Sequence, residues 1–231
     1  MVEEAAALAS RLKHRLSKKE WTISTAESCT GGLIASLLTD ISGASSWFKQ
    51  GWIVYSNDSK MRELGVEKAA FDDDGLGAVS HKVAVQMARG ARYKSGSDVS
   101  IAVTGIAGPG GATEEKEVGR VHVAVIADDY FLVRRMDFGQ NDRLDNKKSF
   151  AAFALRLALE ALDRVDGDKK VEASLSSDPS GVVDLDNSGN DGAPQGTEEW
   201  EGAIAWRSEK KTVSQSLKKI DLASLTDWND Q

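Results

Sequence analysis

The chain has 231 residues, of which 41% are hydrophobic and 28% are charged. This composition is typical of a soluble globular protein and excludes a collagen-like or wholly disordered one. No run approaches the roughly 18 apolar residues of a membrane span, and the acidic start does not match a secretory signal, so we expect a cytoplasmic protein without membrane contact. With one cysteine and three histidines, we expect neither an internal disulfide nor a metal site.

Charge divides the chain into two parts. Residues 166–231 contain 14 acidic and 7 basic residues, and subtraction from the totals of 36 and 29 leaves 22 of each in residues 1–165. The second part is rich in Gly, Ser and Asp and has few bulky apolar residues. We therefore predict one domain over residues 1–165 and an acidic, largely disordered tail over 166–231. A neutral domain with an acidic tail also offers no surface for nucleic acid.

Helical and extended patterns alternate through the first part. Leu8, Leu12 and Leu16 recur at four-residue spacing and predict an opening helix. Further along the chain, strands are predicted at 21–25, 52–56, 99–105, 119–127 and 130–138, and helices at 33–41, 60–64, 81–92 and 143–164. Strands interleaved with helices indicate an α/β fold, which we expect to be a three-layer α/β/α sandwich with a mixed five-stranded sheet.

A polar, glycine-rich turn, AESCTGG, follows the first predicted strand and leads directly into a helix. The hydroxyls of Ser28 and Thr30, the small residues and the positive end of the helix together suit a phosphate group. The alternative is structural: Ser and Thr cap the helix and the glycines allow a tight turn. For this turn taken alone, the structural alternative is the commoner one.

A second glycine-rich segment, residues 104–111, follows the third predicted strand. It lacks the Gly-Lys-Ser/Thr of a Walker A loop and the spacing of a dinucleotide-binding fingerprint. Thr104 would stand at the same sheet edge as the first turn, where ligands bind in open α/β sheets, so the two segments could line one pocket. The alternative is a connection without a ligand.

A third segment carries a serine, a tyrosine and a lysine around the second predicted strand, at Ser45, Tyr55 and Lys60. A serine hydroxyl is a weak nucleophile, and a neutral lysine can activate it with a tyrosine to relay the proton. Such a lysine must be shielded from water, because its pKa has to fall by about 3 units. On spacing alone, a capping serine, an edge tyrosine and a solvated lysine are the commoner outcome.

Five separated segments, namely AESCTGG, GASSWFKQGWIVYSNDSK, GAVSHKVAVQMARGA, TGIAGPGGATEEKEVG and FGQNDR, resemble the C-terminal domain of the competence/damage-inducible CinA family in order and spacing. The resemblance covers about residues 5–163. Stand-alone members of that family are nicotinamide-nucleotide amidohydrolases. The resemblance therefore implies an α/β/α fold and hydrolysis of nicotinamide mononucleotide (NMN) to nicotinate mononucleotide and ammonia, without metal or cofactor. It leaves a homo-oligomer open.

The resemblance also implies roles for single residues. It places the nucleophile at Ser45, next to Ser46 as an alternative, with Tyr55 and Lys60 as its activating partners. It implies a substrate pocket for the ribose phosphate and the nicotinamide, formed by Ser28, Thr30, Gly31, Thr104 and Arg143.

Two other hypotheses stay open. In one, the thiol of Cys29 is the nucleophile, because a cysteine at a strand-to-helix turn can have a lowered pKa. In the other, the chain is a catalytically inactive nucleotide-binding or regulatory module in which the pocket persists. Ammonia release from NMN separates these hypotheses.

Overall fold

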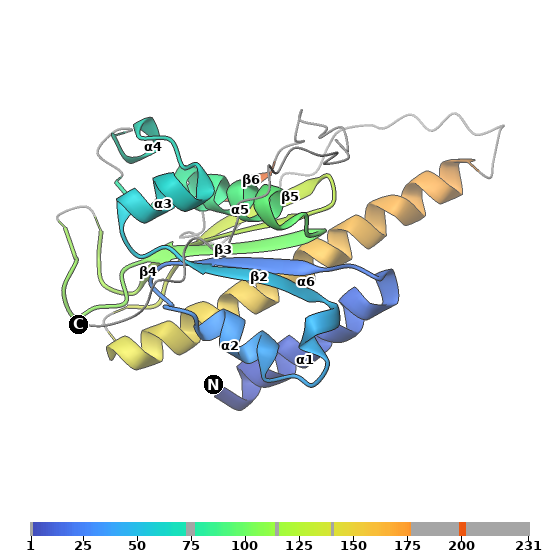
Figure 1. Cartoon of the computed structure of the whole chain (residues 1–231), viewed down its shortest axis with the longest axis horizontal. Coiled ribbons are helices and arrows are strands. Elements are labelled where there is room, and N and C mark those ends of the chain that lie inside the picture. The colour runs from blue at the N-terminus through green and yellow to red at the C-terminus, as the bar shows by residue number, and fades with distance from the viewer. Residues whose placement is uncertain (1, 73–76, 114–115, 140, 177–198, 202–231) are drawn as a thin grey trace, which may run out of the picture.

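Figure 1 shows the computed structural model of the chain. The described residues are 2–72, 77–113, 116–139, 141–176 and 199–201. Among them, no helix is long and apolar enough to cross a membrane.

The strands form one sheet with the order β2-β1-β3-β4-β5-β6 (Figure 1). They are β1 (Ile23–Glu27), β2 (Phe48–Ile53), β3 (Val99–Gly105), β4 (Arg120–Ala127), β5 (Tyr130–Asp137) and β6 (Glu199–Glu201). The first three strands run parallel to one another, and the last three join by antiparallel pairing. The predicted mixed five-stranded sheet is confirmed, and β6 adds a short strand at its edge.

Helices cover both faces of the sheet (Figure 1). They are α1 (Val2–Lys19), α2 (Leu33–Thr39), α3 (Asn57–Leu64), α4 (Ala69–Asp72), α5 (His81–Ser95) and α6 (Arg143–Ser176), with a 3-10 turn at Ala44–Ser46. One core joins α1, α2 and α6 to the sheet, and a second joins α3, α4 and α5 to the opposite face. This confirms the predicted three layers.

Alternation along the buried strands separates these two cores. In β3, Ile101 and Val103 point to the core under α1 and α6, whereas Ala102 points to the core under α5. All three side chains are buried. Because both faces are covered by helices, the strand reads as the near-continuous apolar run seen in the sequence.

Two elements differ from their predicted bounds. The second strand was predicted at 52–56, but β2 ends at Ile53, because the carbonyl groups of Val54 and Tyr55 turn towards the amine of Lys60. The last helix was predicted to end near residue 164, but α6 continues to Ser176. The rest of the predicted tail lies mainly at 177–198 and 202–231, outside the described residues.

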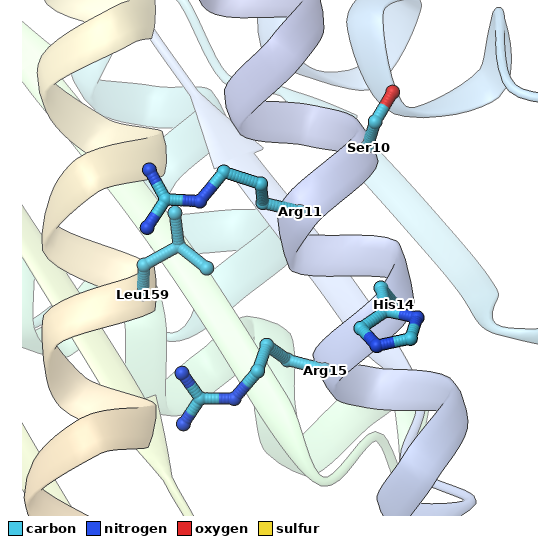
Figure 2. Close-up of a pocket in the computed structure, with 5 residues that line it drawn as sticks. All are labelled: Ser10, Arg11, His14, Arg15 and Leu159. Carbon is cyan, nitrogen blue, oxygen red and sulfur yellow. The ribbon is translucent and has the colours of Figure 1, made fainter.

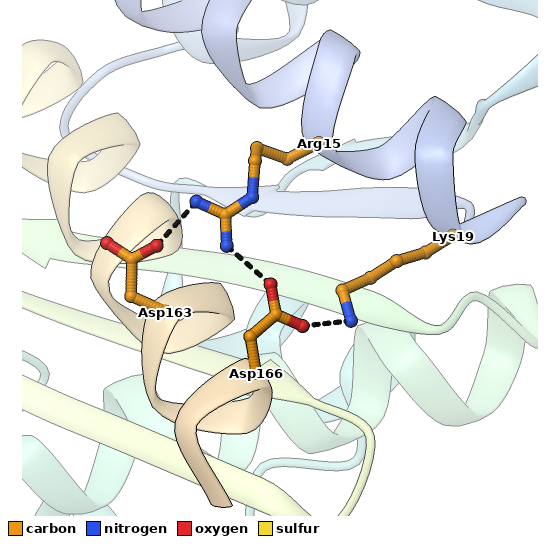
Figure 3. Close-up of polar contacts among 4 residues, drawn as sticks. All are labelled: Arg15, Lys19, Asp163 and Asp166. Carbon is orange, nitrogen blue, oxygen red and sulfur yellow. Dashed lines mark hydrogen bonds and ion pairs between the residues drawn. The ribbon is translucent and has the colours of Figure 1, made fainter. Parts of the chain in front are cut away.

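Ion pairs fix the point at which α6 leaves the domain (Figure 3). Arg15 of α1 pairs with Asp163, and its second nitrogen lies 2.7 Å from Asp166 Oδ2. Lys19 pairs with the other oxygen of Asp166. These contacts extend the packed part of the helix to Asp166, just past Val165, which is buried against the core.

We expect a chain truncated after Gly167 to keep its fold, because the buried side chains of the described core end at Val165. A chain truncated after Arg164 should melt several degrees lower, since it loses both Val165 and the Asp166 ion pairs. Thermal melts of the two proteins measure this difference. Equal melting temperatures would show that α1 does not depend on this end of α6.

Gly90 allows α5 to pack directly on the end of α3. A Cβ atom at this position would overlap the backbone carbonyl of Leu64. Gly90→Ala should therefore lower the free energy of unfolding by about 3 kcal/mol, despite the better helix propensity of alanine. Gly167→Ala in α6 is the matched control, because no atom lies within 4 Å of the added group, and it should be neutral or stabilising in urea titrations.

Candidate active site

Three loops meet at one edge of the sheet, where the parallel strands end. The register pairs Glu27 with Ile53 on one side and with Val103 on the other, so β1, β2 and β3 end at the same level. The loops that follow them carry Ser28, Lys60 and the segment after Thr104. The expectation that the glycine-rich turn and the segment after β3 share one edge is confirmed.

Lys60 lies at the centre of this edge. It belongs to α3, whose first turn is fixed by a capping box between Ser56 and Ser59. Its side chain is only 1% exposed. The amine nitrogen lies 3.1 Å from Ser28 Oγ, and it donates to the carbonyl oxygens of Val54 and Tyr55 at 3.0 and 3.2 Å. The amine is therefore held in a single position by three oxygen atoms.

Burial lowers the pKa of Lys60 to about 8, and the neighbouring thiol of Cys29 acts in the opposite direction. Removing an ammonium group from water disfavours its charged form, which is the physical cause of this shift. A substantial fraction of the amine is then neutral near pH 7 and can accept a proton. This meets the requirement for a lysine base.

Ser28 follows β1 directly and is 8% exposed. Its backbone N–H donates to the carbonyl of Val103 at 3.0 Å, and its own carbonyl accepts from Gly31. These two bonds fix the backbone on which the hydroxyl is carried. A serine held in this way, with a buried amine in hydrogen-bond contact, has the geometry of an activated nucleophile.

The turn after Ser28 is organised by Glu27, which the sequence reasoning missed. The Glu27 carboxylate accepts from the backbone N–H groups of Gly32, Ile34 and Ala35 at 3.0, 3.1 and 2.7 Å. The residue is 1% exposed. The positive end of α2 is therefore occupied by an anion of the protein itself, and the interpretation of this helix end as a phosphate site is wrong.

A sequence signal for Glu27 exists in retrospect. The residue before α2 is Gly32, which offers no side chain for capping. An acidic residue at the end of a buried strand, followed by a glycine turn and an uncapped helix, indicates a carboxylate that folds back onto the helix end.

Tyr55 and Arg143 form a second polar group at the same edge. Arg143, the first residue of α6, donates to the Tyr55 hydroxyl and to the Gly108 carbonyl, both at 2.6 Å. The Tyr55 side chain is 59% exposed. Tyr55 thus contacts Lys60 through its backbone carbonyl, whereas its phenol contacts Arg143.

Ser45 lies elsewhere. It is exposed on the 3-10 turn that precedes β2, whereas Tyr55 and Lys60 follow β2. Six residues of extended strand separate the two ends by roughly 20 Å. The structure therefore does not bring Ser45, or its neighbour Ser46, to the lysine amine within this chain. It brings Ser28 there instead.

The remaining pocket residues have structural contacts. Thr30 is fully buried, and Gly31 adopts a φ of +62° in the turn. The Thr104 hydroxyl donates to the carbonyl of Ala78 at 2.8 Å, which ties β3 to the loop before α5. Of the five predicted substrate-pocket residues, Ser28 contacts the lysine and Arg143 contacts the tyrosine.

Cys29 does not have the properties of a nucleophile. Its side chain is buried, and burial raises the pKa of the thiol to about 12. The thiolate fraction at neutral pH is then negligible.

A surface depression of about 340 Å³ lies between α1 and α6 (Figure 2). It is lined by Ser10, Arg11, His14, Arg15 and Leu159. These helices cover the face of the sheet opposite α3 and α5, so the depression is separate from Lys60. In the part of the chain that the structure describes, no three His, Cys, Asp or Glu side chains are grouped to hold a metal ion.

Comparison with known proteins identifies this architecture. The sequence model described as the CinA C-terminal domain matches residues 5–162. The chain belongs to the CinA C-terminal domain family. The match spans all elements from α1 to most of α6, and it includes Ser28, Tyr55, Lys60 and Arg143.

Solved structures of this family share the fold. The competence/damage inducible protein CihA from Agrobacterium tumefaciens is 42% identical, with a TM-score of 0.66 over 69% of this chain and 96% of that one. A CinA superfamily protein from Escherichia coli is 33% identical, with a TM-score of 0.64 over 67% of this chain and 88% of that one.

Longer relatives also contain this domain. A CinA-like protein of Geotalea daltonii is 50% identical over 132 residues, which are 57% of this chain and 32% of that protein. A CinA-like protein of Chloroherpeton thalassium is 45% identical over 152 residues, 36% of its length. The chain thus spans about a third of the length of these CinA-like relatives.

Proposed function

We propose that the chain hydrolyses the carboxamide of NMN to nicotinate mononucleotide and ammonia. The observation that carries the proposal is the 3.1 Å contact between the buried amine of Lys60 and the hydroxyl of Ser28. The resemblance to CinA-family amidohydrolases supports the substrate. The geometry supports Ser28, rather than Ser45, as the residue that Lys60 activates.

In the acylation step, neutral Lys60 takes the proton of the Ser28 hydroxyl as the oxygen attacks the carboxamide carbon. A C–O bond forms, and the carbonyl oxygen gains negative charge. When the tetrahedral intermediate collapses, the Lys60 ammonium gives its proton to the departing nitrogen, and ammonia leaves. The product is an ester between Ser28 and the nicotinoyl group.

In the deacylation step, a water molecule takes the place of ammonia. Lys60 accepts a proton from this water as it attacks the ester carbon, and then returns the proton to the Ser28 oxygen. Nicotinate mononucleotide leaves as the carboxylate. The two steps consume one water and need no oxidant, reductant or cofactor.

Tyr55 and Arg143 are proposed to position the substrate. The Arg143 guanidinium is anchored by the Gly108 carbonyl and the Tyr55 hydroxyl, so it presents a fixed cationic fork at the mouth of the site. The exposed ring of Tyr55 offers a flat apolar surface for an aromatic base.

Ammonia release from NMN, measured with wild type and three serine variants, tests the proposal. We expect Ser28→Ala to lose at least about a thousandfold in kcat, and Ser45→Ala and Ser46→Ala to stay close to wild type. Loss in Ser45→Ala with an active Ser28→Ala would assign the nucleophile to Ser45. An inactive wild-type protein would support the binding or regulatory module.

A further inference from the structure

A row of polar side chains crosses the sheet beside Ser28. Thr104 of β3 pairs with His122 of β4, and His122 pairs with Arg135 of β5. Ser28 continues β1 at the level of Thr104, because Glu27 pairs with Val103. Neighbouring strands lie about 4.8 Å apart, so His122 is roughly 10 Å from Ser28 across the sheet.

These side chains share the face that α5 covers. Ala102 and Ala124, two residues from Thr104 and His122, belong to the core under that helix. The Thr104 hydroxyl bonds to Ala78 in the loop leading to α5. The row therefore runs beneath the start of α5, on the same side of the sheet as Lys60.

The start of α5 differs from the other helix ends at this edge. The end of α2 is closed by the Glu27 carboxylate, and that of α6 by Asp142, whose side chain accepts from Leu144 N at 2.8 Å. At α5 the cap is the neutral hydroxyl of Ser80, and the first helical residue is His81. The positive end of this fifteen-residue helix has no acidic cap among these contacts.

Basic groups converge on this helix end. The rings of His81 and His122 meet edge to face, with centroids 4.7 Å apart. Lys116 is buried, and its amine lies 4.0 Å from the position that a Cβ atom on Gly77 would take, in the loop before α5. We call His81, His122 and Lys116 the basic cluster. Arg120 and Arg135 nearby share one carboxylate, that of Asp137.

His122 carries an unsatisfied polar atom in this cluster. Its side chain is 7% exposed, and its buried Nδ1 has no hydrogen-bond partner among the described residues. Burial lowers the pKa of His122 to about 3, and His81, Arg135, Arg120 and Lys116 lower it further. A buried polar atom without a partner, surrounded by basic groups, calls for an anion.

We propose that the basic cluster and the start of α5 bind the phosphate monoester of the substrate. The proposal rests on the proposed function, since it places the carboxamide at Ser28 and the 5′-phosphate near His122. A nucleotide can span this separation along the polar row. The negative end of the substrate then meets α5, the helix end at this edge without an acidic cap among its described contacts, rather than α2, which Glu27 occupies.

Binding of phosphate can be tested on the full chain without any reaction. The three histidines of the sequence are His14, His81 and His122, so each imidazole can be followed by NMR. Inorganic phosphate or ribose 5-phosphate in the millimolar range should shift His81 and His122 saturably and raise the pKa of His122, because a nearby anion favours the imidazolium. His14 is exposed on α1 and is the internal control.

Equal, non-saturating shifts of all three histidines would overturn the proposal. This outcome is independent of the proposed function, because phosphate binding needs no amide hydrolysis. Conversely, a protein that binds phosphate at His122 but releases no ammonia would keep this site and refute the amidase.

Kinetics provide the second test. The ratio of kcat/KM for NMN to that for nicotinamide riboside, which lacks the phosphate, should fall at least about tenfold in His122→Gln and in Lys116→Met. His14→Gln is the control and should leave this ratio unchanged. A ratio that stays constant in folded His122→Gln and Lys116→Met proteins would contradict phosphate binding at this cluster.

Discussion

Replacing Lys60 by arginine is expected to lower kcat for amide hydrolysis by about a thousandfold, with a much smaller effect on KM. Arginine keeps the positive charge and a similar reach, but its guanidinium does not lose a proton near neutral pH. It therefore cannot accept the Ser28 proton, a role typically worth a factor of 10² to 10⁴. Steady-state kinetics with wild type and Lys60→Arg measure the loss.

The pH profile provides the matching evidence for the same residue. Because burial lowers the pKa of Lys60 to about 8, kcat/KM of the wild type should rise with pH up to about 8 and then level off. The sign follows from the deprotonated amine being the active form. Lys49→Arg, at an exposed position of β2, is the control and should leave the profile unchanged. A Lys60→Arg protein that keeps more than about a tenth of kcat would show that another group is the base.

Replacing Glu27 by glutamine is expected to lower the free energy of unfolding by about 3 kcal/mol. The carboxylate accepts three backbone N–H groups at the start of α2. The glutamine amide presents one oxygen and an NH2 group that cannot accept, so buried donors lose their partners at about 1 to 3 kcal/mol each. Urea unfolding curves measure the change.

Glu63→Gln is the matched control for Glu27→Gln. Glu63 pairs with Arg62 at 2.7 Å on the surface of α3, where both side chains are substantially exposed, and its loss should cost less than about 1 kcal/mol. Similar effects of the two substitutions would show that the carboxylate of Glu27 does not hold the turn that carries Ser28.

The sequence was sufficient for the layers of the fold because its signals there are local. The apolar run at 99–105 matches β3 residue for residue, and Ser80 caps α5 with a hydrogen bond to Val83 N, as predicted. Periodicity and capping act over a few residues, so they can be recognised without the tertiary structure.

The arrangement of the site could be predicted only in part. Tyr55 and Lys60 lie at the expected edge, but the spacing in the sequence does not show that β2 separates them from Ser45. Ser28 is 32 residues from Lys60 along the chain, and their contact depends on the parallel pairing of β1 and β2. The role of Glu27 also depends on tertiary structure, because the charge of a carboxylate does not reveal which donors it meets.

The most direct measurement is to identify the residue that carries the acyl group during turnover. Wild-type protein mixed with NMN and quenched in acid within one turnover can be digested and analysed by peptide mass spectrometry. The account predicts an acyl adduct on Ser28, absent from Ser28→Ala and from Lys60→Arg. An adduct on Ser45 or Cys29 would contradict it.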